Sequence, residues 1–445
     1  MKKILMVLLS LALLLSCCGA FAGESRKMES PADADDFVAA FFGEHPEEMN
    51  GAWALSAQME SALAAYGGIS GLAAQFAPLG ALLKVDPAYE GEIQGFKAFF
   101  VPCVFSVTSA DLVLIVQDGA IAGLSTGAYS GGKEEAPAES DLFDSVSLPL
   151  PVPSLGELPG ILTLPKGEGP FPAVILIHGS GTSDKDETLG SLKPFRDIAE
   201  GLAAQGVAVY RFDKRSYTFG LYLASDKQFT LENESIEDAV NAVQLLAGQD
   251  KIDPDRIYVL GHSLGGNAIP QIARELVSAP VTARGYIMLA ASPRPLDELI
   301  REQYEYLLSL LPEVTEEQQA EADAVFADLD KLENLDALSE DDTVMNVYSA
   351  YWKWLASYDI MQAAEEITKP VLLLQGEEDY QVTMVDFGIW QDAFGQKENW
   401  TLKSYPGLTH PFVPGLKTEA SAVYSREGKV DEQVILDIAS FVLSN

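Results

Sequence analysis

From residue 173 onward, apolar runs of five to eight residues alternate with longer stretches in which apolar residues recur every three or four positions. The runs are almost continuously apolar, as expected of strands covered on both faces. The longer stretches have the spacing of amphipathic helices. This alternation predicts an α/β fold with a doubly wound, mostly parallel sheet. The predicted strands are 173–178, 207–213, 256–261, 284–291, 371–375 and 400–405, and the predicted helices include 194–205, 236–249 and 264–277.

One connection between predicted strands is much longer than the others. Residues 293 to about 366 show no strand pattern, but they contain three acidic stretches with helical spacing, at 296–311, 316–332 and 344–356. Connections of this length usually have a fold of their own. We therefore predict a helical cap, inserted over the C-terminal edge of the sheet.

The first part of the chain has a different order of elements. Helical spacing comes first, broken by glycine and proline, and strand-like runs follow from about residue 95. Asp118-Gly119 is typical of a hairpin turn between two of these runs. The order predicts a small α+β domain at 30–128, a linker rich in Gly, Glu and Ala at 129–140, and a second domain at 141–445.

The N-terminus has the pattern of an export signal. Lys2 and Lys3 precede a twelve-residue apolar run that is too short to span a bilayer, and Ala20-Phe21-Ala22 is a typical cleavage site, so 1–22 is predicted to be a signal sequence. Residues 14–17 also resemble a bacterial lipoprotein box that ends at Cys17. Both interpretations predict an extracytoplasmic protein, with membrane attachment only through a lipid at Cys17.

Charge and cysteine content exclude several classes of function. The chain has 29 Lys and Arg against 66 Asp and Glu, a formal net charge of −37, which excludes nucleic acid as a partner. Cleavage after Ala22 would leave only Cys103, in an apolar run typical of a buried thiol. No cluster of Cys and His has the spacing of metal ligands, so no metal is predicted.

The strongest chemical signal is Gly261-His262-Ser263-Leu264-Gly265, which has the form G-x-S-x-G. A predicted strand runs into it and a predicted helix leaves it, which is the context of a nucleophile elbow. The glycines allow a sharp turn that raises the serine above the sheet edge. Ser263 is therefore the candidate nucleophile.

A serine nucleophile needs a general base, and the chain has only four histidines. His45 lies in the first domain, His178 ends an early strand and His262 adjoins the nucleophile, which leaves His410 in the loop after the last strand. The acid that orients the base should follow the penultimate strand. Asp379 is our choice there.

Two neighbours of Asp379 remain rivals for the acid, because spacing alone does not exclude them. These rivals are Glu377 and Glu378.

The developing oxyanion needs two backbone N–H donors. One is the N–H of Leu264, directly after the nucleophile. The second should come from the loop after an earlier strand, where we choose the Ser180 N–H over those of Gly179 and Gly181. We also expect several residues near these loops, and one aromatic residue of the cap, to contact substrate: His178, Gly179, Gly181, His262 and Trp352. The spacing of the cap aromatics equally fits a buried helix face.

Charged residues gather after the oxyanion loop. Asp184, Asp186 and Glu187 either bind a substrate amine or pair with the cations Lys185, Lys193 and Arg215, and we favour structural pairing. Residues 213–215 (Asp-Lys-Arg) are interpreted in the same way.

With the elbow, oxyanion loop, acid and histidine in this order, residues 140–445 resemble the α/β-hydrolase superfamily. The runs at 178–187, 193–195 and 210–215 look like those of bacterial exported hydrolases that often carry a small N-terminal domain. Thr182-Ser183 departs from that group, which tends to have proline and asparagine there. The resemblance implies a carboxylesterase-type serine hydrolase that acts on small esters and needs no cofactor.

Two other functions stay open at this point. One is a serine peptidase or aminopeptidase, for which an acidic mouth built from Asp184 and Glu187 would bind the substrate ammonium. The other is a non-catalytic protein that binds a component of the cell envelope. The acyl and alcohol parts of the substrate and the oligomeric state have no signature in the sequence.

Overall fold

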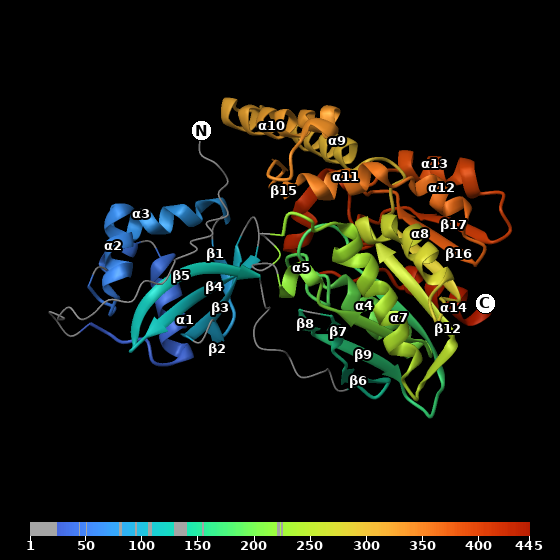
Figure 1. Ribbon diagram of the computed structural model, residues 1–445, viewed down its shortest axis with the longest axis horizontal. Helices are drawn as coiled ribbons and strands as arrows, with labels where there is room; N and C mark the ends of the chain where they lie inside the picture. Colours follow the sequence, from blue (N-terminus) through green and yellow to red (C-terminus); the bar gives the residue numbers. More distant parts are fainter. Residues whose placement is uncertain are drawn as a thin grey trace. The chain divides into compact units, whose positions relative to one another are not determined.

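The computed structural model describes residues 25–445 except 44, 50, 80–81, 94–95, 106–108, 129–139, 154, 220–222 and 224–225. The chain divides into two compact units, one up to Ala136 and one from Pro137 to Asn445 (Figure 1). The predicted signal sequence, the lipoprotein box and, apart from Ser140, the predicted linker lie outside the described residues. Within the described ranges, no helix is both long and apolar enough to cross a membrane.

The first unit is an α+β arrangement of short helices and an antiparallel sheet. Its helix α1 begins at a capping box, in which Ser30 and Asp33 satisfy each other's backbone N–H groups. Apolar residues of the helices and of the sheet form one core, which includes the buried Cys103. The elements are α1 (Pro31–Phe41), η1 (Pro46–Met49), α2 (Ala57–Ala65), α3 (Ile69–Ala73), η2 (Ala74–Leu79), β1 (Leu82–Val85), β2 (Tyr89–Ile93), β3 (Phe96–Phe105), β4 (Ser109–Gln117) and β5 (Ala120–Ala128), with strand order β1-β3-β4-β5 and β2 paired with β3.

The second unit is built on an eight-stranded sheet with the order β17-β16-β13-β12-β10-β11-β9-β6. The six predicted strands form its parallel part: β10 (Phe171–Ile177), β11 (Ala208–Phe212), β12 (Ile252–His262), β13 (Gly285–Leu289), β16 (Val371–Gly376) and β17 (Trp400–Tyr405). Two further strands, β6 (Phe143–Ser147) and β9 (Gly160–Pro165), add an antiparallel edge that the sequence pattern did not predict. A small separate hairpin joins β7 (Leu150–Val152) to β8 (Gly156–Leu158).

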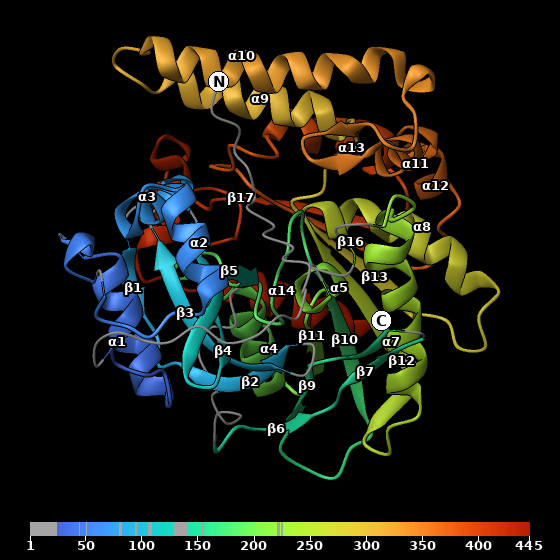
Figure 2. The same ribbon diagram turned by 60° about the vertical axis from the view of Figure 1, so that its left-hand side comes forward.

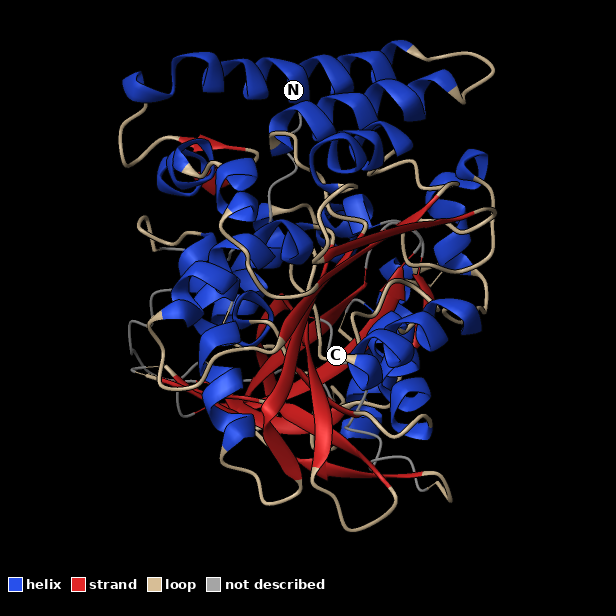
Figure 3. Ribbon diagram, turned by 90° about the vertical axis from the view of Figure 1, so that its right-hand side faces the viewer, coloured by secondary structure: helices blue, strands red, loops and turns tan. Residues whose placement is uncertain are grey.

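Helices cover both faces of this sheet (Figure 3). On one face, α7 (Glu237–Ala247) and α8 (Leu264–Val277) pack against the strands in one apolar cluster. On the other face, α4 (Pro194–Ala204) and α14 (Glu432–Ser444) do so in a second cluster. The remaining short elements are α5 (Arg215–Thr218), the π-helical turn η3 (Glu232–Ile236), α13 (Met384–Phe394) and η5 (Lys417–Ser425).

Residues 293–366, which we call the helical insertion, connect β13 to β16. In Figure 2 its two longest helices, α9 and α10, lie side by side beyond the edge of the sheet. The expectation of no strand here was wrong in one detail, because a small hairpin of two strands, each two residues long, precedes α11. The elements are α9 (Leu296–Ser309), α10 (Glu316–Leu329), η4 (Asp330–Ala337), β14 (Thr343–Val344), β15 (Val347–Tyr348), α11 (Ser349–Ser357) and α12 (Ile360–Glu365).

Candidate active site

Ser263 lies at the sharp turn between β12 and α8. Its backbone has φ 53° and ψ −119°, a strained conformation for a residue with a side chain. A Cβ on Gly261 would lie 2.2 Å from the carbonyl oxygen of Gly265, and one on Gly265 would lie 2.3 Å from that of Ile177. The two glycines are therefore required by close backbone contacts, and the turn leaves Ser263 half-buried rather than sealed in the core.

His410 and Asp379 meet at the same edge of the sheet. His410 Nδ1 lies 2.6 Å from Asp379 Oδ2, and both side chains are buried. His410 also lies beside the elbow, because its ring centroid is 4.7 Å from that of His262. Neither rival acid contacts the histidine: Glu377 accepts a hydrogen bond from Ser404, and Glu378 accepts one from the N–H of Lys417.

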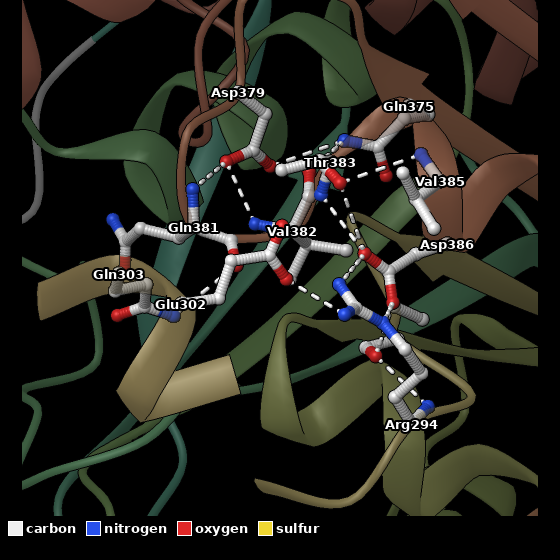
Figure 4. A network of polar contacts seen from close by, with 12 residues as sticks. Arg294, Glu302, Gln303, Gln375, Asp379, Gln381, Val382, Thr383, Val385 and Asp386 are labelled. Atoms are coloured by element: carbon white, nitrogen blue, oxygen red, sulfur yellow. Dashed lines mark hydrogen bonds and ion pairs between the residues drawn. The ribbon is translucent and has the colours of Figure 1, made fainter. Parts of the chain in front are cut away.

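Four donors hold the Asp379 carboxylate in place, and Figure 4 shows those from Gln375, Gln381 and Val382. Its Oδ1 accepts the N–H groups of Gln381 and Val382, at 2.7 and 3.0 Å. Its Oδ2 accepts the Gln375 side chain at 3.1 Å, in addition to His410. Every lone-pair direction of the acid is thus in use, which fixes the carboxylate in one orientation.

The helical insertion is tied to the loop that carries Asp379. Arg294 donates two hydrogen bonds of 2.8 Å to Asp386, which is fully buried and also accepts from Ser292 and from the N–H of Thr383 (Figure 4). Gln303 of α9 donates to the carbonyl oxygen of Gln381 at 3.1 Å. The first residues of the insertion and the acid loop therefore form one polar network.

The predicted oxyanion loop lies against the nucleophile. A Cβ on Gly179 would come within 3.1 Å of the Ser263 Cβ. The Gly179 N–H donates to Glu187 at 2.8 Å, so it is not free to bind an oxyanion. The N–H of Leu264 has no acceptor within its helix, because it opens α8. Leu264 and the exposed Ser180 therefore remain candidate donors, with the N–H of Gly181 as the alternative to that of Ser180.

A second buried carboxylate–imidazole pair lies behind the elbow. Glu187 Oε2 is 3.0 Å from His262 Nδ1, and His262 Nε2 donates to the carbonyl oxygen of His410 at 3.1 Å. Burial is the largest single influence and acts to lower the pKa of His262, but the combined effect of the charge and hydrogen bond of Glu187 and of the His410 carbonyl raises the pKa above its ordinary value. Both ring nitrogens of His262 therefore face groups of the protein itself. The ring holds the loop of His410 and has no polar atom left for substrate.

His178 is a structural residue in this arrangement, not the substrate contact we expected. Its Nε2 donates to the carbonyl oxygen of Asp184 at 2.8 Å, and its ring packs on Phe195. Burial lowers the pKa of His178 from 6.5 to about 4. The ring is therefore neutral in the folded protein over most of the accessible pH range.

Replacing His178 with glutamine should reduce the amount by which the free energy of unfolding falls at acid pH. The unfolded chain takes up a proton at His178 near pH 6.5, whereas the folded protein does so only near pH 4, so stability falls as the pH falls between these values. At pH 4.5 this one group should cost about 2 to 3 kcal/mol. Glutamine keeps the donor to Asp184 but does not titrate. Urea unfolding of both proteins at pH 7 and 4.5 measures the difference, and equal losses would contradict the assignment.

The acidic residues after the oxyanion loop have partners within the protein. Asp186 accepts from Arg211 at 2.8 Å, and Asp184 accepts from both the N–H and the hydroxyl of Thr188. In the following segment, Arg215 makes a bidentate pair with the buried Asp238. These contacts agree with structural pairing. The expected pair of Lys193 with Asp186 is present at 3.4 Å, whereas most of the other partners differ from those expected.

Trp352 lies inside the helical insertion rather than at its surface. It is 5% exposed, its indole N–H donates to the carbonyl oxygen of Val344, and it packs with Leu329. The aromatic spacing that suggested a substrate contact therefore reflects the buried face of α11. Gly181, in contrast, is exposed, and its carbonyl oxygen accepts from Lys214.

Sequence reasoning interpreted Lys214 only as part of a structural charge cluster, and it missed Gln375. Each is a polar residue at or just past the carboxyl end of an apolar strand, which is where the functional residues of such sheets gather. In the part of the chain that the structure describes, no group of three or more His, Cys, Asp or Glu side chains is placed to hold a metal ion.

Comparisons with known proteins add the following similarities. Residues 170–413 match the family model described as serine aminopeptidase, S33. Esterase EstD of Thermotoga maritima is 36% identical over 333 residues, which cover 75% of this chain and 76% of that protein. Est1E of Butyrivibrio proteoclasticus is a similar solved structure, with 18% identity, a TM-score of 0.42 and coverage of 67% of this chain and 99% of that one.

Proposed function

The chain belongs to the serine aminopeptidase S33 family of α/β-hydrolases, and from this premise we propose that it is a carboxylesterase with Ser263 as nucleophile. The observation that carries the proposal is the buried His410–Asp379 pair beside a serine held in a strained turn between strand and helix. The similarity to an esterase over three quarters of the chain supports ester hydrolysis in particular.

The mechanism follows from the position of each group. His410 removes the hydroxyl proton of Ser263 as its oxygen attacks the ester carbonyl, and Asp379 stabilises the imidazolium that forms. The N–H groups of Leu264 and Ser180 bind the oxyanion of the tetrahedral intermediate. The intermediate collapses as His410 protonates the departing alcohol, which leaves an acyl-enzyme. Water then attacks the acyl group with His410 as base, and the carboxylic acid leaves. Protein groups alone supply this chemistry.

A fluorophosphonate probe and a series of p-nitrophenyl esters test the proposal. The purified full chain should be labelled at Ser263, which peptide mass spectrometry locates, and should hydrolyse p-nitrophenyl esters from acetate to decanoate with a maximum at one acyl length. The acyl length at this maximum indicates the size of the acyl pocket. A folded protein that neither reacts with the probe nor hydrolyses any ester of the series would refute the assignment and favour the non-catalytic envelope-binding alternative.

Aminopeptidase activity is the second candidate, and the description of the matching family model favours it. An aminopeptidase needs a carboxylate that is free to bind the substrate ammonium. Glu187 is already paired with His262, and both oxygens of Asp184 accept from Thr188, which weighs against the acidic mouth. Aminoacyl-nitroanilides in the same assay separate the two activities.

Export is a further part of the proposal and rests on residues 1–22 alone. Cell fractionation of the wild type and of Cys17→Ala tests it. Membrane association that is lost in the variant would support a lipid anchor. Release of both proteins in soluble form would support cleavage after Ala22.

A further inference from the structure

Lys214 lies behind the oxyanion loop with its charged group fully engaged. It lies two residues past the end of β11 and is only 2% exposed. Its Nζ lies 2.8 Å from the carbonyl oxygen of Gly179, 2.9 Å from that of Gly181 and 3.1 Å from Glu234 Oε1. Three N–H bonds thus meet three acceptors, two of which belong to the oxyanion loop.

These contacts determine where the candidate oxyanion donor points. In a trans peptide, the C=O of one residue and the N–H of the next point in opposite directions. Because the Gly179 carbonyl faces Lys214, the N–H of Ser180 must point away from it. The Gly179 N–H is held in turn by Glu187 at 2.8 Å. Buried charged side chains therefore fix both polar groups of Gly179, the residue that packs against Ser263.

The same lysine is linked to the helical insertion. Glu234 of η3 is 7% exposed, and its Oε1 also accepts the hydroxyl of Ser216 at 3.0 Å. Its other oxygen, Oε2, accepts the hydroxyl of Tyr351 at 2.6 Å. Tyr351 belongs to α11 of the insertion and is itself buried. A continuous polar chain therefore runs from the insertion through Glu234 and Lys214 to the oxyanion loop.

We propose that Lys214 is a positioning residue that orients the Ser180 N–H for oxyanion binding, and that Glu234 and Tyr351 couple this orientation to the helical insertion. The inference rests on the proposed function, because it assigns a role within that site. An ammonium bound to the Gly179 carbonyl also polarises the peptide, which makes the Ser180 N–H a stronger donor. The effect should be felt in the transition state, where the oxyanion forms, and little in substrate binding.

The first test is the double variant Lys214→Met/Glu234→Met, which removes the ion pair without leaving a buried charge unpaired. We expect kcat to fall about 100-fold, with KM within about threefold of the wild type. The inhibition constant of an aryl trifluoromethyl ketone, which adds to the serine as an oxyanion, should rise by a similar factor. A residue that only stabilises the fold would change neither kcat nor the inhibition constant in the folded variant, so these readouts identify a positioning role for Lys214.

The matched control is Arg215→Met/Asp238→Asn, which removes a neighbouring ion pair of similar burial with no contact to the oxyanion loop. It should lower the melting temperature but leave kcat and the inhibition constant within about threefold. If the Lys214 double variant is folded and behaves like this control, the inference is wrong. A wild type that neither hydrolyses esters nor reacts at Ser263 would instead refute the proposed function, and the inference with it.

Tyr351→Phe tests the coupling even if the double variant does not fold. It removes one hydroxyl and keeps the ion pair. We expect kcat to fall about fivefold at unchanged KM, because Glu234 loses one of the groups that hold it. Wild-type kcat and inhibitor affinity in this variant would overturn the link to the insertion.

Discussion

Replacing Ser263 with alanine should lower kcat for ester hydrolysis by about 10⁶-fold and abolish labelling by a fluorophosphonate. Alanine has no oxygen to attack the carbonyl, so the remaining groups have no covalent step to assist. The side chain is half-buried and its removal leaves the core intact. Thermal unfolding of the variant should therefore match that of the wild type.

A glycine at the same position provides the matched comparison. Alanine keeps the strain of a positive φ at residue 263, whereas glycine adopts this conformation without steric cost. Ser263→Gly should therefore be equally inactive but more stable than Ser263→Ala, by about 1 kcal/mol. Residual turnover above about one hundredth of the wild type in either variant would show that another residue is the nucleophile.

The positions of the sharp turn at Ser263 and of the core strands could be predicted because their signals are local. Gly261 and Gly265 are required by contacts within one turn, and the apolar run before them is a strand whatever surrounds it. Strand β9, which lies between β11 and β6, was missed because turn residues stand at both of its ends. It begins with Gly160 and ends with Pro165.

The polar organisation of the site could not be predicted in the same way. Glu187 meets His262, and Lys214 meets Glu234, across distances in the sequence that only the folded sheet closes. Charge pattern alone indicates that such residues pair, but not with which partner. The burial of Trp352 could not be predicted either, because the helical spacing of the aromatic residues fits a core face and a pocket wall equally well.

Replacing Asp379 with asparagine should lower kcat by about 10⁴-fold at nearly constant KM. Asp379 Oδ1 faces two backbone N–H donors, so the amide oxygen of asparagine would take that place. Its NH₂ group would then face His410 Nδ1 and the Gln375 amide, both of which donate to the acid in the wild type. The NH₂ group and the Nδ1–H of His410 are both donors, so they cannot bind each other. The imidazole would therefore adopt the tautomer with its proton on Nε2, and this nitrogen could no longer accept the proton of Ser263.

Matched changes at the neighbouring acids isolate this effect. Glu377→Gln and Glu378→Gln remove the same charge within two residues of Asp379, but their carboxylates contact Ser404 and Lys417 instead of His410. Both should keep kcat within about threefold of the wild type, since neither carboxylate contacts His410 and partly exposed charges have small effects. A large loss in Glu377→Gln or Glu378→Gln, together with an active Asp379→Asn, would transfer the role of the acid to that residue. Steady-state kinetics on one p-nitrophenyl ester, with circular dichroism to establish folding, decides between them.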